Sequence, residues 1–285
     1  MAVPTEPLSG ISSLIVVDST LVGAQTDATL NLPSDVVDVA TKNDFGWRQT
    51  LPGVTSWSLD TGNLVKDTAN AKPFLSNDSP NRVSVSIDIG GVQTNIAKMT
   101  DVSITATQDV ELVSTHDGGL EQSLFLGERD VSVDITALYL DPAATTSQFQ
   151  ELLDARDNAT DLDAVITIDQ LTISGSFSLS DLSISGQAQA SPIETSFSLS
   201  SNGPVTKGGT DFDTSVSMIL SGFFGQSLVT SAFELQDNTG AISGSTRYEG
   251  DGYFTDVSLD LSTESAASMT STVTGDGAIT TAPVT

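Results

Sequence analysis

Carboxylates are the side chains in this sequence that come closest to forming a chemical site. Aspartates cluster at Asp211 and Asp213, and at Asp157, Asp161 and Asp163. Two carboxylates on either side of a glycosidic bond could hydrolyse it, and several oxygen ligands on one loop could bind Ca²⁺. The second cluster, however, lacks the central glycine and the terminal glutamate of an EF-hand loop. Because 37 of the 285 residues are acidic, such clusters arise from composition, and we predict no catalytic site and no metal site.

The sequence lacks the residues that a thiol nucleophile, a histidine-based triad or a phosphate loop would need. The sequence has no Cys and a single His, His116, so neither a thiol nucleophile nor a histidine-based triad can form within one chain. A repeat of the segment around His116 has Lys42 at the same position, so an imidazole is not required there. The glycine-rich stretch 203–209 does not follow the strand, glycine loop, Lys and helix of a phosphate loop. We therefore expect a protein that is not an enzyme and needs no cofactor.

The chain is strongly acidic, with 37 Asp and Glu against 10 Lys and Arg, a formal net charge of −27 and a pI near 4.1. Such a charge repels phosphate backbones and argues against direct gripping of nucleic acid. It can serve solubility, or it can adapt the protein to high salt, where charges are screened within about 3 Å at 1 M. No apolar run approaches the ~18 residues of a membrane span, and the start, MAVPTEPLSG, lacks the pattern of a secretory signal. We expect no membrane association and synthesis in a cytoplasm.

Alternation of apolar and polar residues with a period of two dominates the sequence. The clearest runs are 28–32, 82–89, 131–135, 173–179 and 257–261. Such alternation is typical of antiparallel strands with one buried face. Clusters of Gly, Asn and Asp separate the runs and indicate turns. The pattern predicts an all-β fold.

Two segments have helical spacing instead. In the first, apolar residues of 149–153 share one helical face with Arg156, and Ser147 begins a capping box. The second, 214–222, has apolar residues three and four positions apart, although alternation over 215–218 leaves a strand possible. We predict one short helix in the first segment and consider a helix or a strand for the second.

The sequence repeats itself. Three segments of the first part match at one shift of 74 positions, namely 27–30 with 101–104, 39–43 with 113–117 and 58–60 with 132–134. Three segments of the second part also match one another, namely 173–176 with 242–245, 180–184 with 255–259 and 202–206 with 276–280. The two segments with helical spacing match as well. Fixed spacing between similar segments indicates repeated structural units.

The order of the copies predicts one domain inserted into another. The chain reads first half, first half again, second half, second half again, so 80–208 contains a complete unit. The segments 10–79 and 209–285 must then complete each other. We predict two similar antiparallel β-sandwich or barrel domains, each with one short helix, with the inner one inserted into the outer one. A strand-exchanged pair and chance similarity among Ser- and Thr-rich strands are the alternatives, and short connections favour the nested arrangement.

A polar stretch of about twenty residues, 61–80, has no counterpart of equal length in the other copy. A structureless loop of that length in a compact domain is usually functional. Its apolar residues are Leu64, Val65, Phe74 and Leu75. We predict that the stretch is a contact arm for a neighbouring subunit. The alternative is a mobile loop in solvent.

Several segments of the inner unit form a series of strands and turns around the short helix. They are Asp101-Val102-Ser103-Ile104, Thr115-His116-Asp117-Gly118, the helix from Phe149 to Arg156, Ser174-Gly175-Ser176-Phe177, Asp181-Leu182-Ser183-Ile184 and Asn202-Gly203-Pro204-Val205-Thr206. With these segments, the unit resembles the major tail tube proteins of long-tailed, siphovirus-like double-stranded DNA viruses. The outer copy is similar to the same family in its early strands and intervening loop, over 41–58. The resemblance covers nearly the whole chain and includes no catalytic signature.

The resemblance implies a β-sandwich or barrel with one flanking helix, whose inner sheets join those of neighbouring subunits into a continuous tube. Six domains per ring are usual in that family, so two-domain chains would form pseudo-hexameric rings as homotrimers. Stacked rings would surround a tape-measure protein, meet tail terminator and baseplate proteins, and conduct viral DNA during ejection without binding it specifically. The protein would then be located in the tail of a virion.

Two other function classes are consistent with parts of the sequence. A secreted β-sandwich adhesin or carbohydrate-binding module of a halophile would need clustered exposed aromatic residues. The candidates are Trp47, Trp57, Phe223, Phe224 and Tyr253. A carboxylate-dependent glycosidase is the third hypothesis, but an aromatic content of 6% leaves few side chains to stack on a sugar.

Overall fold

The computed structural model describes residues 12–22, 25–39, 49–65, 82–89, 92–114, 122–138, 148–186, 193–209, 214–237, 240–241, 245–263 and 266–283. Within these ranges the secondary structure is antiparallel β-sheet with two α-helices. The all-β fold predicted from the period-two alternation is confirmed.

One group of elements lies between residues 83 and 209. It consists of β7 (Val83–Ile89), β8 (Val92–Asn95), β9 (Met99–Ser114), β10 (Gln122–Leu138), α1 (Gln148–Asp157), β11 (Leu162–Ile168), β12 (Leu171–Ser185), β13 (Glu194–Ser201) and β14 (Thr206–Gly209). We call these elements the inner group.

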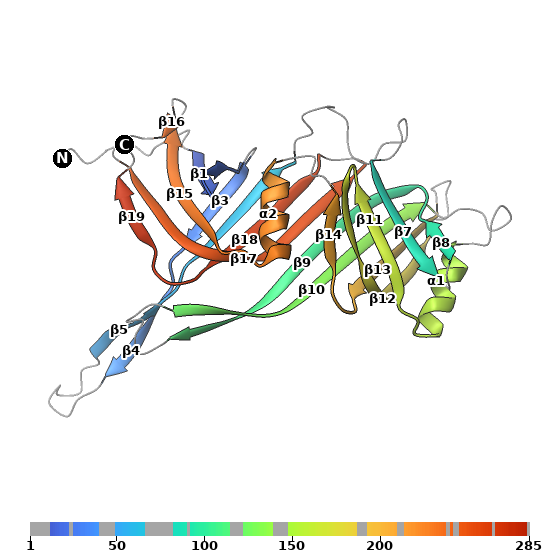
Figure 1. Ribbon diagram of the computed structural model, residues 1–285, viewed down its shortest axis with the longest axis horizontal. Coiled ribbons are helices and arrows are strands. Elements are labelled where there is room, and N and C mark those ends of the chain that lie inside the picture. The colour runs from blue at the N-terminus through green and yellow to red at the C-terminus, as the bar shows by residue number, and fades with distance from the viewer. Residues whose placement is uncertain are drawn as a thin grey trace.

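The remaining elements come from both ends of the chain, and we call them the outer group. The first six are β1 (Ser12–Val17), β2 (Thr20–Leu21), β3 (Gln25–Asn31), β4 (Ser34–Val39), β5 (Gln49–Thr55) and β6 (Ser58–Leu64). The others are α2 (Thr214–Gly225), β15 (Val229–Asp237), β16 (Gly240–Ala241), β17 (Thr246–Ser262), β18 (Ser268–Gly275) and β19 (Thr280–Pro283). In Figure 1 the outer group forms the left half of the molecule and most of the inner group the right half.

In the inner group, β12 belongs to two ladders of strands. Its N-terminal half pairs with β11 and β14, and β11 continues to β7 and β8. Its C-terminal half pairs with β13, which is followed by β10 and β9. A register shift between Leu179 and Asp181 separates the two halves. Such a bulge bends a strand and lets it serve two sheets.

The outer group repeats this pairing order around β17. The N-terminal half of β17 pairs with β15 and β19, and β15 continues to β1, which pairs with β2. The C-terminal half pairs with β18, followed by β6 and β3. A register shift between Phe254 and Asp256 falls where β12 has its own shift. The repeat found in the sequence is therefore also a repeat of strand pairing, bulges included.

A single strand pair joins the two groups into one sheet. β9 pairs antiparallel with the C-terminal half of β17, from Asp101 opposite Ser262 to Thr107 opposite Asp256. The resulting order is β12–β13–β10–β9–β17–β18–β6–β3, which we call the joined sheet. Figure 1 shows β9 and β10 running from the inner group beneath the outer group. Among the described strands, β3 and the C-terminal half of β12 are its two edges.

Each group carries one helix with a single apolar face. The buried residues of α1 are Leu152 and Ala155, and those of α2 are Val216, Ile219, Leu220 and Phe223. Positions three and four apart lie on one side of a helix, so this spacing packs each helix against its sheet. Past each helix a residue adopts the left-handed conformation with a φ of 48°, Ala159 after α1 and Gln226 after α2. Both helices are confirmed, and the strand considered for 214–222 is wrong.

The polar stretch 61–80 does not begin as a loop, which corrects the sequence-based prediction. β6 continues through Leu64, which pairs with Ser268 of β18. The alternation pattern did not predict this strand, because Thr61 and Asn63 face the core but are polar.

The four residues predicted for a contact arm are only partly described. Leu64 is exposed at the end of β6, and Val65 packs against the core. Phe74 and Leu75 lie outside the described residues. The contact role of these four residues stays a prediction.

Candidate functional surface

One face of the joined sheet carries Asp, Ser, Thr and Asn side chains, and we call it the polar face. Along each strand these residues alternate with core residues, and directly paired residues lie on the same face. From one edge to the other the set is Asp181, Ser183 and Ser185 of β12; Ser196, Ser198 and Ser200 of β13; Ser132, Asp134 and Thr136 of β10; Asp101, Ser103, Thr105 and Thr107 of β9; Asp256, Ser258 and Asp260 of β17; Thr270, Thr272 and Thr274 of β18; Ser58, Asp60 and Gly62 of β6; and Asp27, Thr29 and Asn31 of β3.

The other face of the joined sheet is apolar and buried. Ile104 of β9, Ile135 of β10, Phe197 of β13 and Leu259 of β17 belong to the hydrophobic core. Apart from Gly62, the residues of the polar face are exposed or half-buried. The polar face is therefore the side of this sheet that the rest of the described chain leaves uncovered.

Hydroxyl and amide groups on the polar face donate hydrogen bonds to its carboxylates. Ser103 Oγ donates to Asp260 Oδ1 across the β9–β17 pair at 2.5 Å. Thr272 Oγ1 and Asn31 Nδ2 both donate to Asp60, at 2.7 Å and 2.8 Å. These donors hold the carboxylates in place, and no ion pair with these carboxylates occurs among the described residues.

The polar face concentrates negative charge. Its acidic residues are Asp27, Asp60, Asp101, Asp134, Asp181, Asp256 and Asp260, and none of its positions carries a basic residue. A surface of this kind repels phosphate groups, and its hydroxyls keep it hydrated. The arrangement is suited to a surface along which nucleic acid can move without adhering.

Two carboxyls at the ends of the β9–β17 pair have raised pKa values. Burial, followed by the charge of Asp260, raises the pKa of Asp101. Burial, followed by the charge of Asp60, raises the pKa of Asp256. Both causes disfavour the ionised form, so each charged carboxylate slightly opposes folding at neutral pH.

We expect Asp256→Asn to stabilise the protein at pH 7, by less than about 1 kcal/mol because the site is only half-buried. The folded state binds this proton more tightly than the unfolded state, so the wild type regains the lost stability as the pH falls through the raised pKa of Asp256. The advantage of the variant should therefore shrink towards pH 4. Urea unfolding of both proteins at a series of pH values measures it, and an advantage that did not change with pH would contradict the assignment.

The carboxylates singled out as a possible metal or catalytic cluster do not converge. Asp161 Oδ1 accepts hydrogen bonds from Ser178 Oγ at 3.2 Å and from Asn202 Nδ2 at 2.8 Å, so it holds two strand ends together. Asp157 forms an ion pair with Arg156 of its own helix at 2.9 Å. Within the described ranges no group of three or more potential metal ligands occurs. His116, Asp211 and Asp213 lie outside these ranges.

The aromatic residues considered for sugar binding are largely taken up by the core. Trp57 and Phe223 are buried, and Phe224 and Tyr253 are half-buried. Trp47 lies outside the described residues. The structure thus gives no exposed aromatic platform among the four described candidates. Neither of the two described helices is long and apolar enough to cross a membrane.

Comparison with known proteins gives similarity to solved structures only, since no family model and no curated protein matches the sequence. One similar chain is from the virion of a native gene transfer agent (GTA) particle, with a TM-score of 0.39, 15% identity, and coverage of 46% of this chain and 98% of that chain. A second is from the tail of an empty GTA particle with C6 symmetry, with a TM-score of 0.40, 14% identity, and coverage of 47% and 99%. A third is from the six-fold symmetrised baseplate of the anti-feeding prophage (AFP), with a TM-score of 0.37, 12% identity, and coverage of 47% and 97%.

Proposed function

We propose that this protein is a structural component of a virion, the major subunit of a viral tail tube, and that it polymerises as stacked rings around a channel for DNA. The observation that carries the proposal is the joined sheet, in which two equivalent sets of strands pair through β9 and β17 and leave open the edges that correspond to β9 and β17. The nested domains, 10–79 with 209–285 and 80–208, are part of the proposal, and the repeated pairing order supports them.

The two open edges of the joined sheet correspond to the two strands that pair within the chain. β3 is the outer equivalent of β9, and the C-terminal half of β12 is the inner equivalent of that of β17. At the junction, β9 pairs with the C-terminal half of β17. Their counterparts, β3 and the C-terminal half of β12, each have one side without a partner among the described strands. Unpaired strand edges are templates for pairing with another chain. The edge of β12 in one copy would therefore pair with β3 of the next.

The register of the proposed pair follows from the register of β9 with β17. Ile104 lies opposite Leu259, and the equivalent residues at the open edges are Leu30 and Ile184. Leu259 is 1% exposed at the junction, whereas Ile184 is 46% exposed at the edge. The proposed pair would give Ile184 the apolar surroundings that Leu259 already has.

A second pair of positions gives the same comparison. Ala106 lies opposite Val257, and the equivalent residues are Leu32 and Leu182. Ala106 is 2% exposed, whereas Leu32 is 52% exposed. Exposed apolar residues therefore occur on both open edges, at the positions that the junction buries.

Pairing between unlike edges is heterologous, so it produces either a closed ring or a filament. Three copies would close a ring of six equivalent units, the number usual in the family that the sequence resembles. The apolar face is covered by the rest of each chain, so the polar face would line the channel. Its carboxylates would keep DNA phosphates from adhering during ejection. A tape-measure protein inside the tube, and terminator and baseplate proteins at its ends, are the partners that this role requires.

Electron microscopy of the purified protein tests this function. In negative stain at high salt, which screens the net charge of −27, we expect rings or tubes with a central hole. Native mass spectrometry should give a mass of three chains or multiples of it. A protein that remains monomeric at every protein and salt concentration would contradict the proposal.

A further inference from the structure

Two cavities occupy equivalent places in the two groups. The first, of about 400 Å³, is bounded by 128–131 of β10, by 203–205 and by the end of α2. The second, of about 230 Å³, is bounded by Leu32 and Pro33, by 55–57 and by 277–279. The shift of 74 positions converts 129–131 into 55–57 and 203–205 into 277–279, so the same two segments form both cavities.

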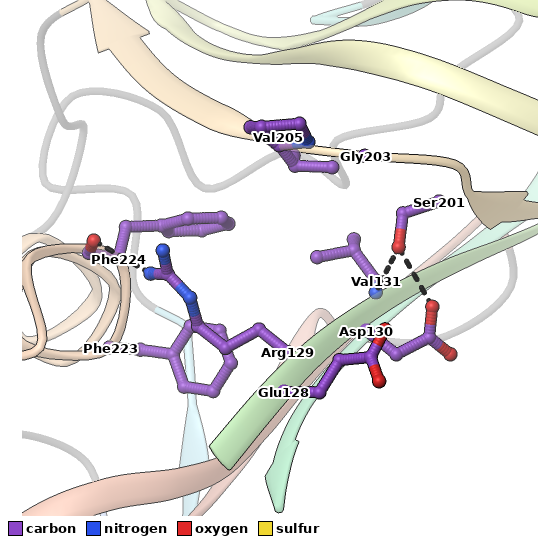
Figure 2. A pocket seen from close by; sticks show the side chains of 10 residues that line it. Glu128, Arg129, Asp130, Val131, Ser201, Gly203, Val205, Phe223 and Phe224 are labelled. Carbon is purple, nitrogen blue, oxygen red and sulfur yellow. Dashed lines mark hydrogen bonds between the residues drawn. The ribbon is translucent and has the colours of Figure 1, made fainter. Parts of the chain in front are cut away.

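The first cavity lies where the outer group meets the inner group, and a helix end closes one side of it. Arg129 Nη1 donates a hydrogen bond to the carbonyl oxygen of Phe224 at 2.9 Å. Phe223 and Phe224 at the end of α2 line the cavity opposite Val205 (Figure 2). Carbonyl groups in the last turn of a helix have no donor within the helix, and a cation is a favourable partner for them. This contact accompanies the β9–β17 pair that joins the groups.

The second cavity has no helix among its lining residues. By equivalence, the helix that would close it is α1, since Arg156 and Asp157 correspond to Phe223 and Phe224. Figure 1 places α1 at the far end of the inner group, away from β3 and β19 of the outer group, so α1 of the same chain does not reach this cavity. In the last turn of α1, Arg156 and Asp157 form an ion pair with each other, and their side chains are exposed by 46% and 60%.

The chemistry of the second cavity fits the end of α1. The lining of the first cavity includes Phe223 and Val131, and the equivalent residues are Arg156 and Trp57. Trp57 is only 3% exposed, so an arginine does not stack on its ring, but the aliphatic part of Arg156 can cover Leu32, which is 52% exposed.

We propose that the cavity at Leu32, Pro33, Thr55, Trp57 and Ile279 receives the last turn of α1 from a second copy of this chain. The inference rests on the proposed ring, because the β12–β3 pair would bring α1 of one copy to this cavity of the next. In this contact, the end of α1 packs beside the proposed pair of β12 in one copy with β3 in the next. The equivalent contact within one chain, between Arg129 and Phe224, is the template.

Cysteine cross-linking tests this contact, and the absence of native Cys makes it specific. The pair Thr55→Cys and Asp157→Cys corresponds to Arg129 and Phe224. Copies carrying one substitution each are mixed and treated with a short bismaleimide, and we expect covalent dimers only when both variants are present. The matched negative pair is Thr55→Cys with Gln170→Cys, an exposed turn residue of the inner group.

A variant without cysteine gives a second readout. Arg156→Ala should raise the protein concentration needed for half-maximal assembly about fivefold, because the methylene groups of Arg156 would no longer cover Leu32. Arg156→Phe, which installs the residue that α2 carries, should restore assembly.

The outcomes separate this inference from the proposed function. Rings with a cross-link between residues 55 and 157 support both. Rings that give no such cross-link, and that assemble normally with Arg156→Ala, overturn the helix contact and leave the tube function standing. Monomers that give neither rings nor cross-links overturn both.

Discussion

Ile184→Pro should abolish assembly while leaving the chain folded. Leu182 N–H donates to the side chain of Asp181 at 2.9 Å rather than to β13. Directions of N–H groups alternate along a strand, so the N–H of Ile184 points to the same open edge. Proline is tolerated at an edge where the N–H faces solvent. The substitution therefore removes a donor that only a neighbouring copy would use.

The expected loss of affinity is large. Each interface would lose a backbone hydrogen bond and much of the burial of one isoleucine, about 3 kcal/mol together. This corresponds to a roughly hundredfold weaker contact at every interface. Light scattering coupled to size-exclusion chromatography measures the shift from assembled protein to monomer.

Two controls accompany the proline variant. Ile184→Val keeps the N–H and most of the apolar area, so it should assemble like the wild type. Circular dichroism should show that the proline variant retains its β-sheet and melts within a few degrees of unassembled wild-type protein. Normal rings formed by the proline variant would exclude β12 as the edge that pairs between copies.

Lysines on the polar face should make the assembled protein bind DNA. Asp134 and Asp260 are exposed and stand on different sets of strands, so a double Asp134→Lys, Asp260→Lys variant places six lysines around a ring of three chains. Charges that converge on one channel reinforce one another. We expect binding of duplex DNA with a dissociation constant on the order of 10⁻⁵ M near physiological salt, against none for the wild type. Filter binding over a salt series measures both affinity and salt dependence.

The control for this variant carries the same charge change on another sheet. Asp88 and Asp163 lie opposite each other on β7 and β11, outside the joined sheet. Asp88→Lys with Asp163→Lys gives the same net charge but places the lysines outside the proposed channel. Equal DNA binding by the two double variants would show that net charge, and not the polar face, prevents adhesion.

The fold was predictable where local pattern and packing agree. Alternation over 82–89 and 131–135 predicted β7 and the C-terminal half of β10, because residues with high and low exposure alternate there. The three- and four-residue spacing of Val216, Ile219 and Leu220 outweighed a short alternating run, because a buried helical face involves more of the segment. Where polar residues occupy core positions, as Thr61 and Asn63 do in β6, the pattern failed.

The candidate surface could be predicted only in part. Alternation assigns Asp101, Ser103 and Thr105 to one side of a strand, but it does not say which side the rest of the chain covers. The β9–β17 pair joins residues 149 to 161 positions apart, and no local signal in Asp101 or Asp256 marks it. The two open edges and the two equivalent cavities therefore cannot be predicted without this long-range pair.

The nesting of one set of strands within the other also governs the order in which the chain can fold during synthesis. β1 pairs with β15, more than 200 positions later, whereas the strand pairs of β7 through β14 all form before residue 210 except the junction of β9 with β17. The strand pairs of the inner group can thus form while β1 still lacks β15 and β6 still lacks β18. During that interval the unpaired edges of these N-terminal strands can aggregate. Slow translation of the last quarter of the gene should therefore lower the yield of soluble protein more than slow translation of the middle.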